Sequence, residues 1–227
     1  MKYCLLFFLA VVNYNLAFSQ SVRSIRAKAG DDIAQAYSPN GFYRFPQFSE
    51  AKLCFKTGSK KTGILFNYNI FSGQMQFISP KGDTLDVANA ADIDSIVFAK
   101  NIFLFNDGFI EVIGQNDSLR LLKKVVLKTD VEKIGAYGLP SSTAAINSFT
   151  TYSSGSSVYN LVLNQDVILI EHNYWFFLSG KTILKANKTN LFDLLPVQKQ
   201  AKAQSYLKQN KTSFEKENDL KKLLEAI

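Results

Sequence analysis

Short apolar runs separated by turn residues fill residues 63–115 and predict an antiparallel β-meander. The runs cover residues 64–66, 75–78, 96–98, 102–105 and 109–113. Turn-forming residues stand between them, at Ser72 and Gly73 and within residues 80–83 and 106–108. Met75 and Phe77 alternate with Gln74 and Gln76, which is the period of a strand with one buried face. Runs of this length, bounded by Gly, Pro, Asn and Asp, favour strands over helices.

The same kind of pattern continues on both sides of the meander. Further strands are expected over residues 51–57, 118–128, 158–163, 167–171, 175–178 and 182–186, with a single helical turn near residues 89–93. The apolar residues within 118–128 are also compatible with one face of a helix, and the β-branched pair Val125 and Val126 favours a strand. Cys54 lies in the first of these strands and is expected to be a small buried hydrophobe. The fold class predicted is mainly β (α+β): an antiparallel β-meander, in a barrel or sandwich-like domain, with C-terminal helices.

The hydrophobic period becomes helical in the C-terminal segment, residues 187–227. Asn190 is placed to cap a short helix that Pro196 ends. A second helix is expected over residues 198–209.

The last helix has the clearest pattern. Thr212 and Glu215 have the spacing of a capping box. Apolar residues follow at i, i+3, i+4 and i+7, namely Leu220, Leu223, Leu224 and Ile227. This stripe is expected to pack against the face of the β domain.

Two segments lack a clear period. Residues 20–50 are expected to be a weakly ordered lead-in whose aromatic side chains dock on the sheet. Residues 135–157 form a long loop rich in Ser, Thr, Gly and Ala. Such a loop is either a mobile linker or a binding loop, and in the second case it presents Tyr137, Phe149 and Tyr152. After the lead-in, residues 51–227 are expected to be a single β-rich domain that includes this long loop and the C-terminal helical segment.

The first 19 residues have the features of a secretory signal peptide. Lys2 precedes an apolar run over residues 4–12, about half the roughly 20 residues that span a bilayer. Ala17 and Ser19 supply the small residues that signal peptidase requires, so cleavage is expected after Ser19. Gln20, not Cys, would then be first, which argues against a lipid anchor. The chain is expected to be exported, to the periplasm or the cell surface, without a transmembrane segment after cleavage.

Basic residues are unevenly distributed. Residues 21–180 hold 15 Lys and Arg against 14 Asp and Glu, whereas residues 181–227 hold 10 Lys against 5 acidic residues. Within the second segment Lys199, Lys202, Lys208 and Lys211 follow one another without an intervening acid. They are either a solvated helix surface or a basic face for an anionic partner. Nucleic acid is not expected as a partner, because this face has a single aromatic residue and no Arg.

The residue types required by several kinds of chemistry are scarce. His172 is the only histidine and was expected at a turn, so neither a Ser–His–acid triad nor the usual zinc sites are indicated. No glycine pattern for binding nucleotides occurs, and no cofactor is expected. Carboxylates remain candidates: Asp83 with Asp86, and Asp92 with Asp94, are the closest pairs.

Three tripeptides read Asp, then Ser or Thr, then an aliphatic residue. This order resembles the acceptor sequence of the general O-glycosylation system of exported Bacteroidota proteins. The candidate acceptors are Thr84, Ser95 and Ser118.

Longer stretches also resemble exported proteins of unknown function that are found widely in Bacteroidota. The resemblance is carried by residues 65–69, 73–78, 81–85 and 134–138 and by the ending with Lys208, Asn210, Phe214, Asp219, Leu220 and Leu223. It implies envelope localisation and a shared architecture, and it implies no activity.

The function expected from these observations is non-catalytic. The chain would be an exported binding or structural module for a partner protein or an envelope component such as a glycan. The alternative is a carboxylate-dependent glycan hydrolase, which requires two Asp or Glu side chains about 5–10 Å apart in a cleft.

Overall fold

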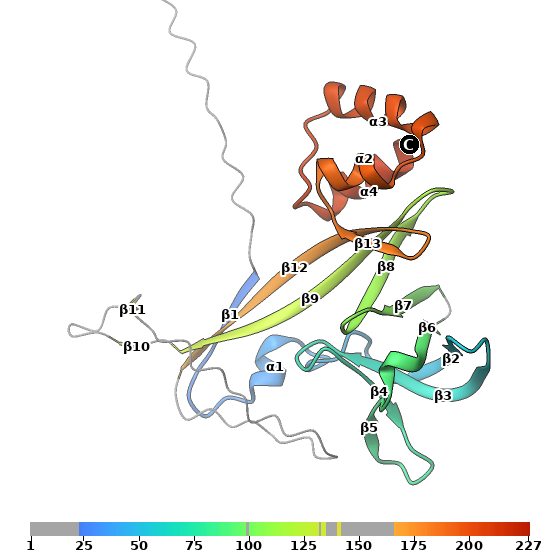
Figure 1. Ribbon diagram of the computed structural model, residues 1–227. Coiled ribbons are helices and arrows are strands. Elements are labelled where there is room, and N and C mark those ends of the chain that lie inside the picture. The colour runs from blue at the N-terminus through green and yellow to red at the C-terminus, as the bar shows by residue number, and fades with distance from the viewer. Residues whose placement is uncertain (1–22, 99, 132, 135–139, 142–165) are drawn as a thin grey trace, which may run out of the picture.

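The computed structural model describes residues 23–98, 100–131, 133–134, 140–141 and 166–227 (Figure 1). The strands are β1 (Arg23–Ala27), β2 (Ser49–Phe55), β3 (Lys60–Asn69), β4 (Gln74–Ile78), β5 (Thr84–Asp86), β6 (Ile93–Phe98), β7 (Asn101–Phe105), β8 (Phe109–Gln115), β9 (Arg120–Val131), β10 (Lys133–Ile134), β11 (Pro140–Ser141), β12 (Val167–Ser179) and β13 (Thr182–Lys185). The helices are α1 (Ile33–Tyr37), α2 (Lys188–Leu194), α3 (Val197–Gln209) and α4 (Glu217–Ala226), with one 3-10 turn at Ala90–Asp92.

Eleven strands form one open antiparallel sheet. Its order is β1-β12-β9-β8-β7-β6-β2-β3-β4-β5, and β13 pairs with residues 176–179 of β12, at the other end of that strand from β1. The predicted fold class, mainly antiparallel β with C-terminal helices, is confirmed, and the sheet does not close on itself. The meander predicted over residues 63–115 is present in two parts, β3-β4-β5 and β6-β7-β8, because β2 lies between β3 and β6. The short pair β10 and β11 stands apart from this sheet.

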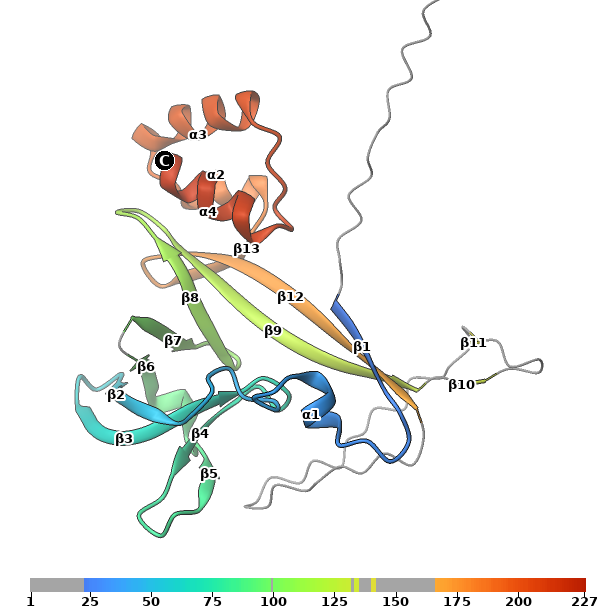
Figure 2. The same ribbon diagram turned by 180° about the vertical axis from the view of Figure 1, so that it is seen from behind.

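Two apolar clusters lie against the same face of the sheet, which we call the inner face. The larger cluster packs against the strands from β2 to β7, which we call the lower strands, and includes Phe66, Met75, Phe103 and Phe109. The second lies where the three C-terminal helices cover the upper ends of β8, β9 and β12 (Figure 2). There the predicted stripe of α4 is buried together with Leu119, Leu121 and Phe177. The prediction that this helix packs on the β domain is confirmed.

The lead-in is more ordered than the sequence suggested. From residue 23 it contributes β1, which pairs with β12, and α1, whose first N–H groups are capped by the Asp32 carboxylate. Ala27, Ile33 and Tyr37 are buried in the larger cluster. The expected docking of aromatic residues is also present, since Phe42 and Phe45 pack against this cluster. Its lack of a regular period reflects the shortness of these elements, each of which is five residues long.

The largest error of the sequence reading is at His172. The polar residues 171–173 were interpreted as a turn between two strands, but they lie in the middle of β12, a single strand of 13 residues. β9 pairs with β12 over its whole length from Val167 to Leu178, so β9 supplies the hydrogen bonds that keep β12 extended. The Asn173 amide donates to the Glu171 carboxylate at 3.1 Å, which partly satisfies both polar groups.

Two helix caps also differ from the prediction. Asn187, not Asn190, caps α2 by accepting from the Asn190 N–H at 2.8 Å. The predicted capping box is not present, because α4 starts at Glu217 with Lys216 at its N-cap and no side-chain cap there. The spacing of polar residues along the sequence did not show at which residue α2 and α4 begin.

Burial departs from the simple alternation at two positions of the lower strands. Gln76 is buried rather than exposed, because it lies between the Tyr43 hydroxyl, which donates to it at 2.8 Å, and the Asp86 carboxylate, to which it donates at 2.7 Å. Cys54 is only half-buried and is a free thiol.

Candidate functional site

A pocket of about 360 Å³ opens where β8 separates from β7. Pairing between these two strands stops at Ile102 and Val112, while β8 continues to pair with β9 as far as Gln115 and Arg120 (Figure 1). Helix α4 lies across this free end of β8. We call the space the β8–α4 pocket; it is lined by Arg44, Lys100, Asn101, Ile102, Glu111, Val112, Ile113, Gly114, Gln115, Lys123, Glu217 and Lys221.

A β-bulge fixes how β8 meets the helix. The register with β9 shifts between Val112 and Gly114, so that Gly114 pairs with Leu121 and faces α4. Helix α4 approaches closely there: a Cβ on Gly114 would lie 3.2 Å from the Leu224 Cδ2 atom. The Asn116 amide donates to the Leu224 carbonyl at 2.9 Å and holds the end of the helix to the β8–β9 turn.

The first ion pair of the pocket joins Arg44 and Glu111. Arg44 Nε and Nη2 donate to the two oxygens of Glu111 at 3.0 and 3.1 Å, the two-pronged geometry that is strongest for these groups. Arg44 is held in place because its backbone N–H donates to the Tyr68 carbonyl at 2.9 Å. Glu111 is 8% exposed, so its charge depends on this partner.

Glu111 also affects a neighbouring tyrosine. Burial, and after it the negative charge of Glu111, raise the pKa of Tyr68 to about 12. Tyr68 therefore stays neutral throughout the physiological range and adds no negative charge beside Glu111.

The second ion network joins β9 to α4. Lys123 lies directly opposite Glu111 in the register, so both side chains project from the inner face. Glu217, in the first turn of α4, accepts from Lys123 Nζ at 2.9 Å and from Lys221 Nζ, one helical turn away, at 2.7 Å. Burial alone would raise the pKa of Glu217, but the hydrogen bonds and charges of Lys221 and Lys123 outweigh it and lower the pKa. This carboxylate is therefore held in its ionised form.

The pH dependence of stability follows from this shift. A carboxylate whose pKa is lower in the folded than in the unfolded state stabilises the fold above its unfolded pKa, about 4.3, and the contribution is lost as the pH falls through the folded pKa. We expect wild-type protein to be more stable than the Glu217→Gln variant at pH 7, and this difference to shrink steadily below about pH 4. Urea unfolding of both proteins between pH 3 and 7 measures it. A difference that stays constant over this range would contradict the assignment of the ion network.

The charges of the pocket suit an anion better than acid–base chemistry. Its lining holds four cations, Arg44, Lys100, Lys123 and Lys221, and two carboxylates, Glu111 and Glu217, a formal charge of +2 (4 − 2). A general acid requires a carboxyl with a raised pKa. The pKa of Glu217 is instead lowered, and Glu111 accepts two hydrogen bonds from the Arg44 guanidinium.

A buried donor without a partner lies beside this network. Within the described residues, Trp175 Nε1 is one of two buried side-chain atoms with no hydrogen-bond partner, the other being Asn173 Oδ1. Trp175 stands directly opposite Lys123 in the register, on the inner face. Buried polar groups are nearly always paired, so an acceptor near Lys123 would complete this region.

None of the predicted binding residues that the structure describes lines this pocket. Tyr137, Phe149 and Tyr152, with most of the loop over residues 135–157, fall outside the described residues. Lys199, Lys202 and Lys208 lie on α3, and Lys211 lies after its end.

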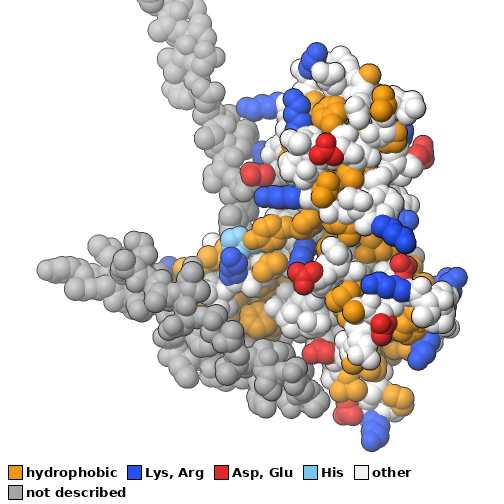
Figure 3. Space-filling view, in the orientation of Figure 1, with side chains coloured by type: hydrophobic (Ala, Val, Ile, Leu, Met, Phe, Trp, Pro, Cys, Tyr) orange, Lys and Arg blue, Asp and Glu red, His pale blue; other side chains and the backbone are white. Residues whose placement is uncertain are grey.

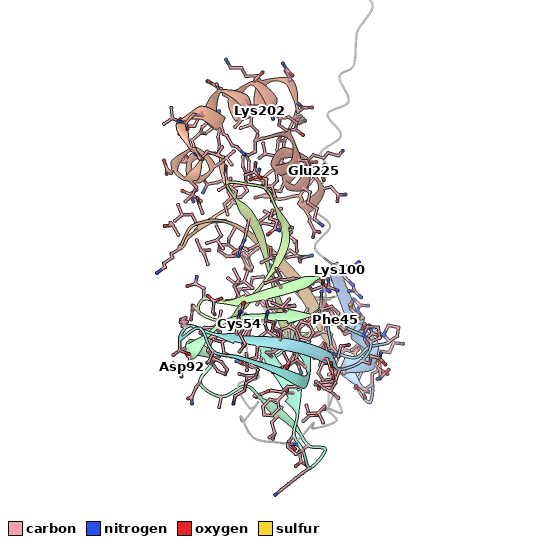
Figure 4. The ribbon with its side chains drawn as sticks, turned by 90° about the vertical axis from the view of Figure 1, so that its right-hand side faces the viewer. Phe45, Cys54, Asp92, Lys100, Lys202 and Glu225 are labelled. Atoms are coloured by element: carbon pink, nitrogen blue, oxygen red, sulfur yellow. The ribbon has the colours of Figure 1, made fainter. Side chains whose placement is uncertain are left out.

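The four lysines do not form one basic face. At 100° per residue, Lys208 points about 180° away from Lys199, so spacing along the sequence did not translate into a common surface. Lys199 also approaches the Asp117 carboxylate, at 3.9 Å. Figure 4 shows Lys202 on the helical layer, away from the Lys100 side of the pocket.

The candidate glycosylation residues differ in accessibility. Ser95 is buried in β6, and its hydroxyl donates to the Asp94 carboxylate at 3.2 Å, which leaves little room for a glycan. Thr84, at the start of the edge strand β5, is half-buried. Ser118, also half-buried, lines a second pocket of about 520 Å³ at the β8–β9 turn.

The carboxylate pairs singled out in the sequence are not part of the β8–α4 pocket. Asp86 pairs with Gln76, and Asp92 and Asp94 are exposed, as Figure 4 shows for Asp92 at the edge of the lower strands. Sequence reasoning missed Glu111 and Arg44. The signal was present: Glu111 interrupts the apolar run over residues 109–113, and Arg44 stands among the aromatic residues of the lead-in.

His172 lies on the opposite face of β12 and stacks on Tyr174, with ring centroids 6.4 Å apart. In the part of the chain that the structure describes, no group of three His, Cys, Asp or Glu side chains is placed to hold a metal ion. Every helix in that part is too short or too polar to cross a membrane.

Comparison with known proteins adds no assignment: no protein-family model, no curated protein and no solved structure matches this chain.

Proposed function

We propose that this chain is an exported, non-catalytic binding module of the cell envelope, and that it holds an acidic ligand in the β8–α4 pocket. The observation that carries the proposal is the set of six charged side chains around one cavity, with an excess of cations and with both carboxylates already engaged in ion pairs. Export is supported by the short apolar run and the small residues before Gln20.

The pocket suits a ligand that carries carboxylate or phosphate groups. Arg44 and the lysines can each donate further N–H groups, because a guanidinium has five and an ammonium three. Each carboxylate of the pocket keeps these cations in place while leaving part of their donor capacity free. Acidic sugars of envelope glycans have this chemistry, as does inorganic phosphate. The cavity is larger than a single phosphate ion, so its size favours an acidic sugar over phosphate.

Lys100 offers the clearest test, because it is exposed and lines the pocket at the β6–β7 turn (Figure 4). We expect a trimer of galacturonic acid to bind wild-type protein and the Lys100→Met variant to bind it at least about fivefold more weakly, as expected for loss of one charge-assisted hydrogen bond. Isothermal titration calorimetry measures both affinities. Lys222→Met is the matched control, since Lys222 is equally exposed and lies outside the pocket.

Two further ligands define the chemistry. The methyl-esterified trimer has the same sugars without the charges and should bind much more weakly, and inorganic phosphate at the same concentration should not displace the acidic trimer. Equal binding of charged and esterified trimers would contradict an anion site. Release of shorter sugars during incubation would contradict a non-catalytic role and favour the hydrolase alternative.

A further inference from the structure

The outer face of the sheet, opposite the helices, has an ordered pattern of its own on β9. Side chains on one face of a strand recur every second residue, and β9 reads Arg120, Leu122, Lys124, Val126 and Lys128 on its outer face. Cationic and aliphatic side chains thus alternate along the whole upper part of this strand.

The neighbouring strand supplies an apolar row beside this pattern. Register pairs place Ile170, His172, Tyr174, Phe176 and Leu178 of β12 next to the five residues of β9 in reverse order. β13 extends the row, because Ile183 pairs with Leu178, and Lys185 pairs with Phe176. We call these positions of β9, β12 and β13 the outer basic–apolar face.

The middle of this face is a floor of buried aliphatic side chains with half-buried edges. Leu122 is 0% exposed and packs with Ile110 and Leu178, while Phe176 and Ile183 are half-buried around them. Tyr174 is one of the exposed large hydrophobic residues of the described chain, at 36%. Figure 3 shows hydrophobic side chains gathered in the middle of the molecule, between the helical layer and the lower strands.

The helices do not cover this surface. They pack on the inner face against Leu121 and Phe177, which alternate with Leu122 and Phe176 along the same strands. The outer positions of β9, β12 and β13 named above carry the cations Arg120, Lys124, Lys128 and Lys185 and no carboxylate. Arg120, Lys128 and Lys185 are exposed, whereas Lys124 is half-buried and donates to the Asp107 carbonyl at 2.8 Å.

We propose that the outer basic–apolar face docks an acidic, amphipathic segment of a partner protein. Apolar side chains of that segment would cover Phe176 and Tyr174, and its carboxylates would meet the exposed cations of β9 and β13. This surface is separate from the β8–α4 pocket, and the proposal does not depend on the function assigned to that pocket.

The size of the face favours a single segment over a second copy of this chain. Residues 120–128 of β9 and the width from β9 to β13 give roughly 26 Å by 10 Å, or about 260 Å². A stable dimer buries about 800 Å² on each partner. Helix α3 of a second copy carries no acidic residue, so it does not offer the carboxylates that this face would pair with.

A lipid surface fits less well than a peptide. Amphipathic elements that bind bilayers insert apolar side chains about 5–10 Å into the headgroup boundary. Phe176 and Ile183 are instead half-buried beside a buried floor, an arrangement that receives side chains rather than inserting its own.

The test uses a fluorescein-labelled, 14-residue amphipathic peptide with Leu on one face and Glu on the other, and its counterpart with Lys in place of Glu. Fluorescence anisotropy with full-length protein should show binding of the Glu peptide and not of the Lys peptide. The double variant Lys128→Glu/Lys185→Glu should weaken this binding at least tenfold. Lys188→Glu/Lys222→Glu is the matched control, with the same change in net charge at exposed positions off this face, and should bind as wild type does.

A second variant tests the apolar part. Tyr174→Ser should also weaken binding of the Glu peptide, with cooperative thermal unfolding showing that the variant is folded. Equal loss of affinity in both double variants would show attraction to net charge only and would overturn the proposal. Binding of phosphatidylglycerol vesicles without binding of the peptide, or a dimer in sedimentation equilibrium that Tyr174→Ser dissociates, would overturn it in favour of a lipid or a second copy.

Discussion

Replacing Leu223 with alanine is expected to lower the free energy of unfolding by about 3 kcal/mol, the middle of the range for a fully buried leucine. Leu223 is 0% exposed and lies in the cluster that joins α4 to the strands, with Leu119 and Phe177 among its members. The substitution removes apolar contacts and leaves a cavity, because helix and sheet are both fixed by other contacts and collapse only partly. Urea unfolding followed by far-ultraviolet circular dichroism measures the change.

The neighbouring residue provides the control for this prediction. Lys222 lies one position earlier on α4 and is exposed, so Lys222→Ala should change the free energy of unfolding by less than about 0.5 kcal/mol. If Leu223→Ala were as stable as Lys222→Ala, α4 would not be packed on the β domain, and the pocket that depends on this packing would lose one wall.

Replacing Arg44 with methionine is expected to cost about 2–3 kcal/mol, because it leaves the Glu111 carboxylate buried without its partner. The full penalty for a buried pair is larger, but the Arg44 side chain is 43% exposed, so water reaches the site and reduces it. Thermal and urea unfolding at pH 7 measure the loss.

A double variant separates the ion pair from simple packing. In Arg44→Met/Glu111→Gln the uncompensated charge is gone, so this protein should be more stable than Arg44→Met alone although it carries one more substitution. Additive destabilisation by the two substitutions would indicate that Arg44 and Glu111 do not interact in solution.

Much of the fold could be predicted because its signals are local. Residues 63–115 alternate between apolar runs and turns, and each hairpin there joins strands that are close in sequence. The insertion of β2 between β3 and β6 has no such local signal, so the meander was wrongly expected to be continuous. The stripe with Leu220 and Leu223 needs only the helical period. β12 was split because the polar residues 171–173 have low strand preference, and the long register with β9 that overrides this preference cannot be seen locally.

The candidate pocket could not be predicted because its residues come from distant parts of the chain. Arg44 and Glu111 are 67 positions apart, and Lys123 and Glu217 are 94 apart. Arg44 reaches Glu111 because the lead-in is hydrogen-bonded to Tyr68 of β3, and Lys123 reaches Glu217 through the packing of α4. Both contacts are consequences of the complete fold. A charged residue inside an apolar run, as at Glu111, is the local signal that a buried ion pair leaves in the sequence.

The most direct test of the account is to locate the binding of an acidic ligand on the molecule. Titration of ¹⁵N-labelled protein with the galacturonic acid trimer, followed by amide chemical shifts, measures this for each residue. We expect the largest shift changes on residues 100–102, 113–115 and 217–221, and we expect the methyl-esterified trimer not to produce them. Changes confined to α3, or identical changes with both trimers, would contradict an anion site between β8 and α4.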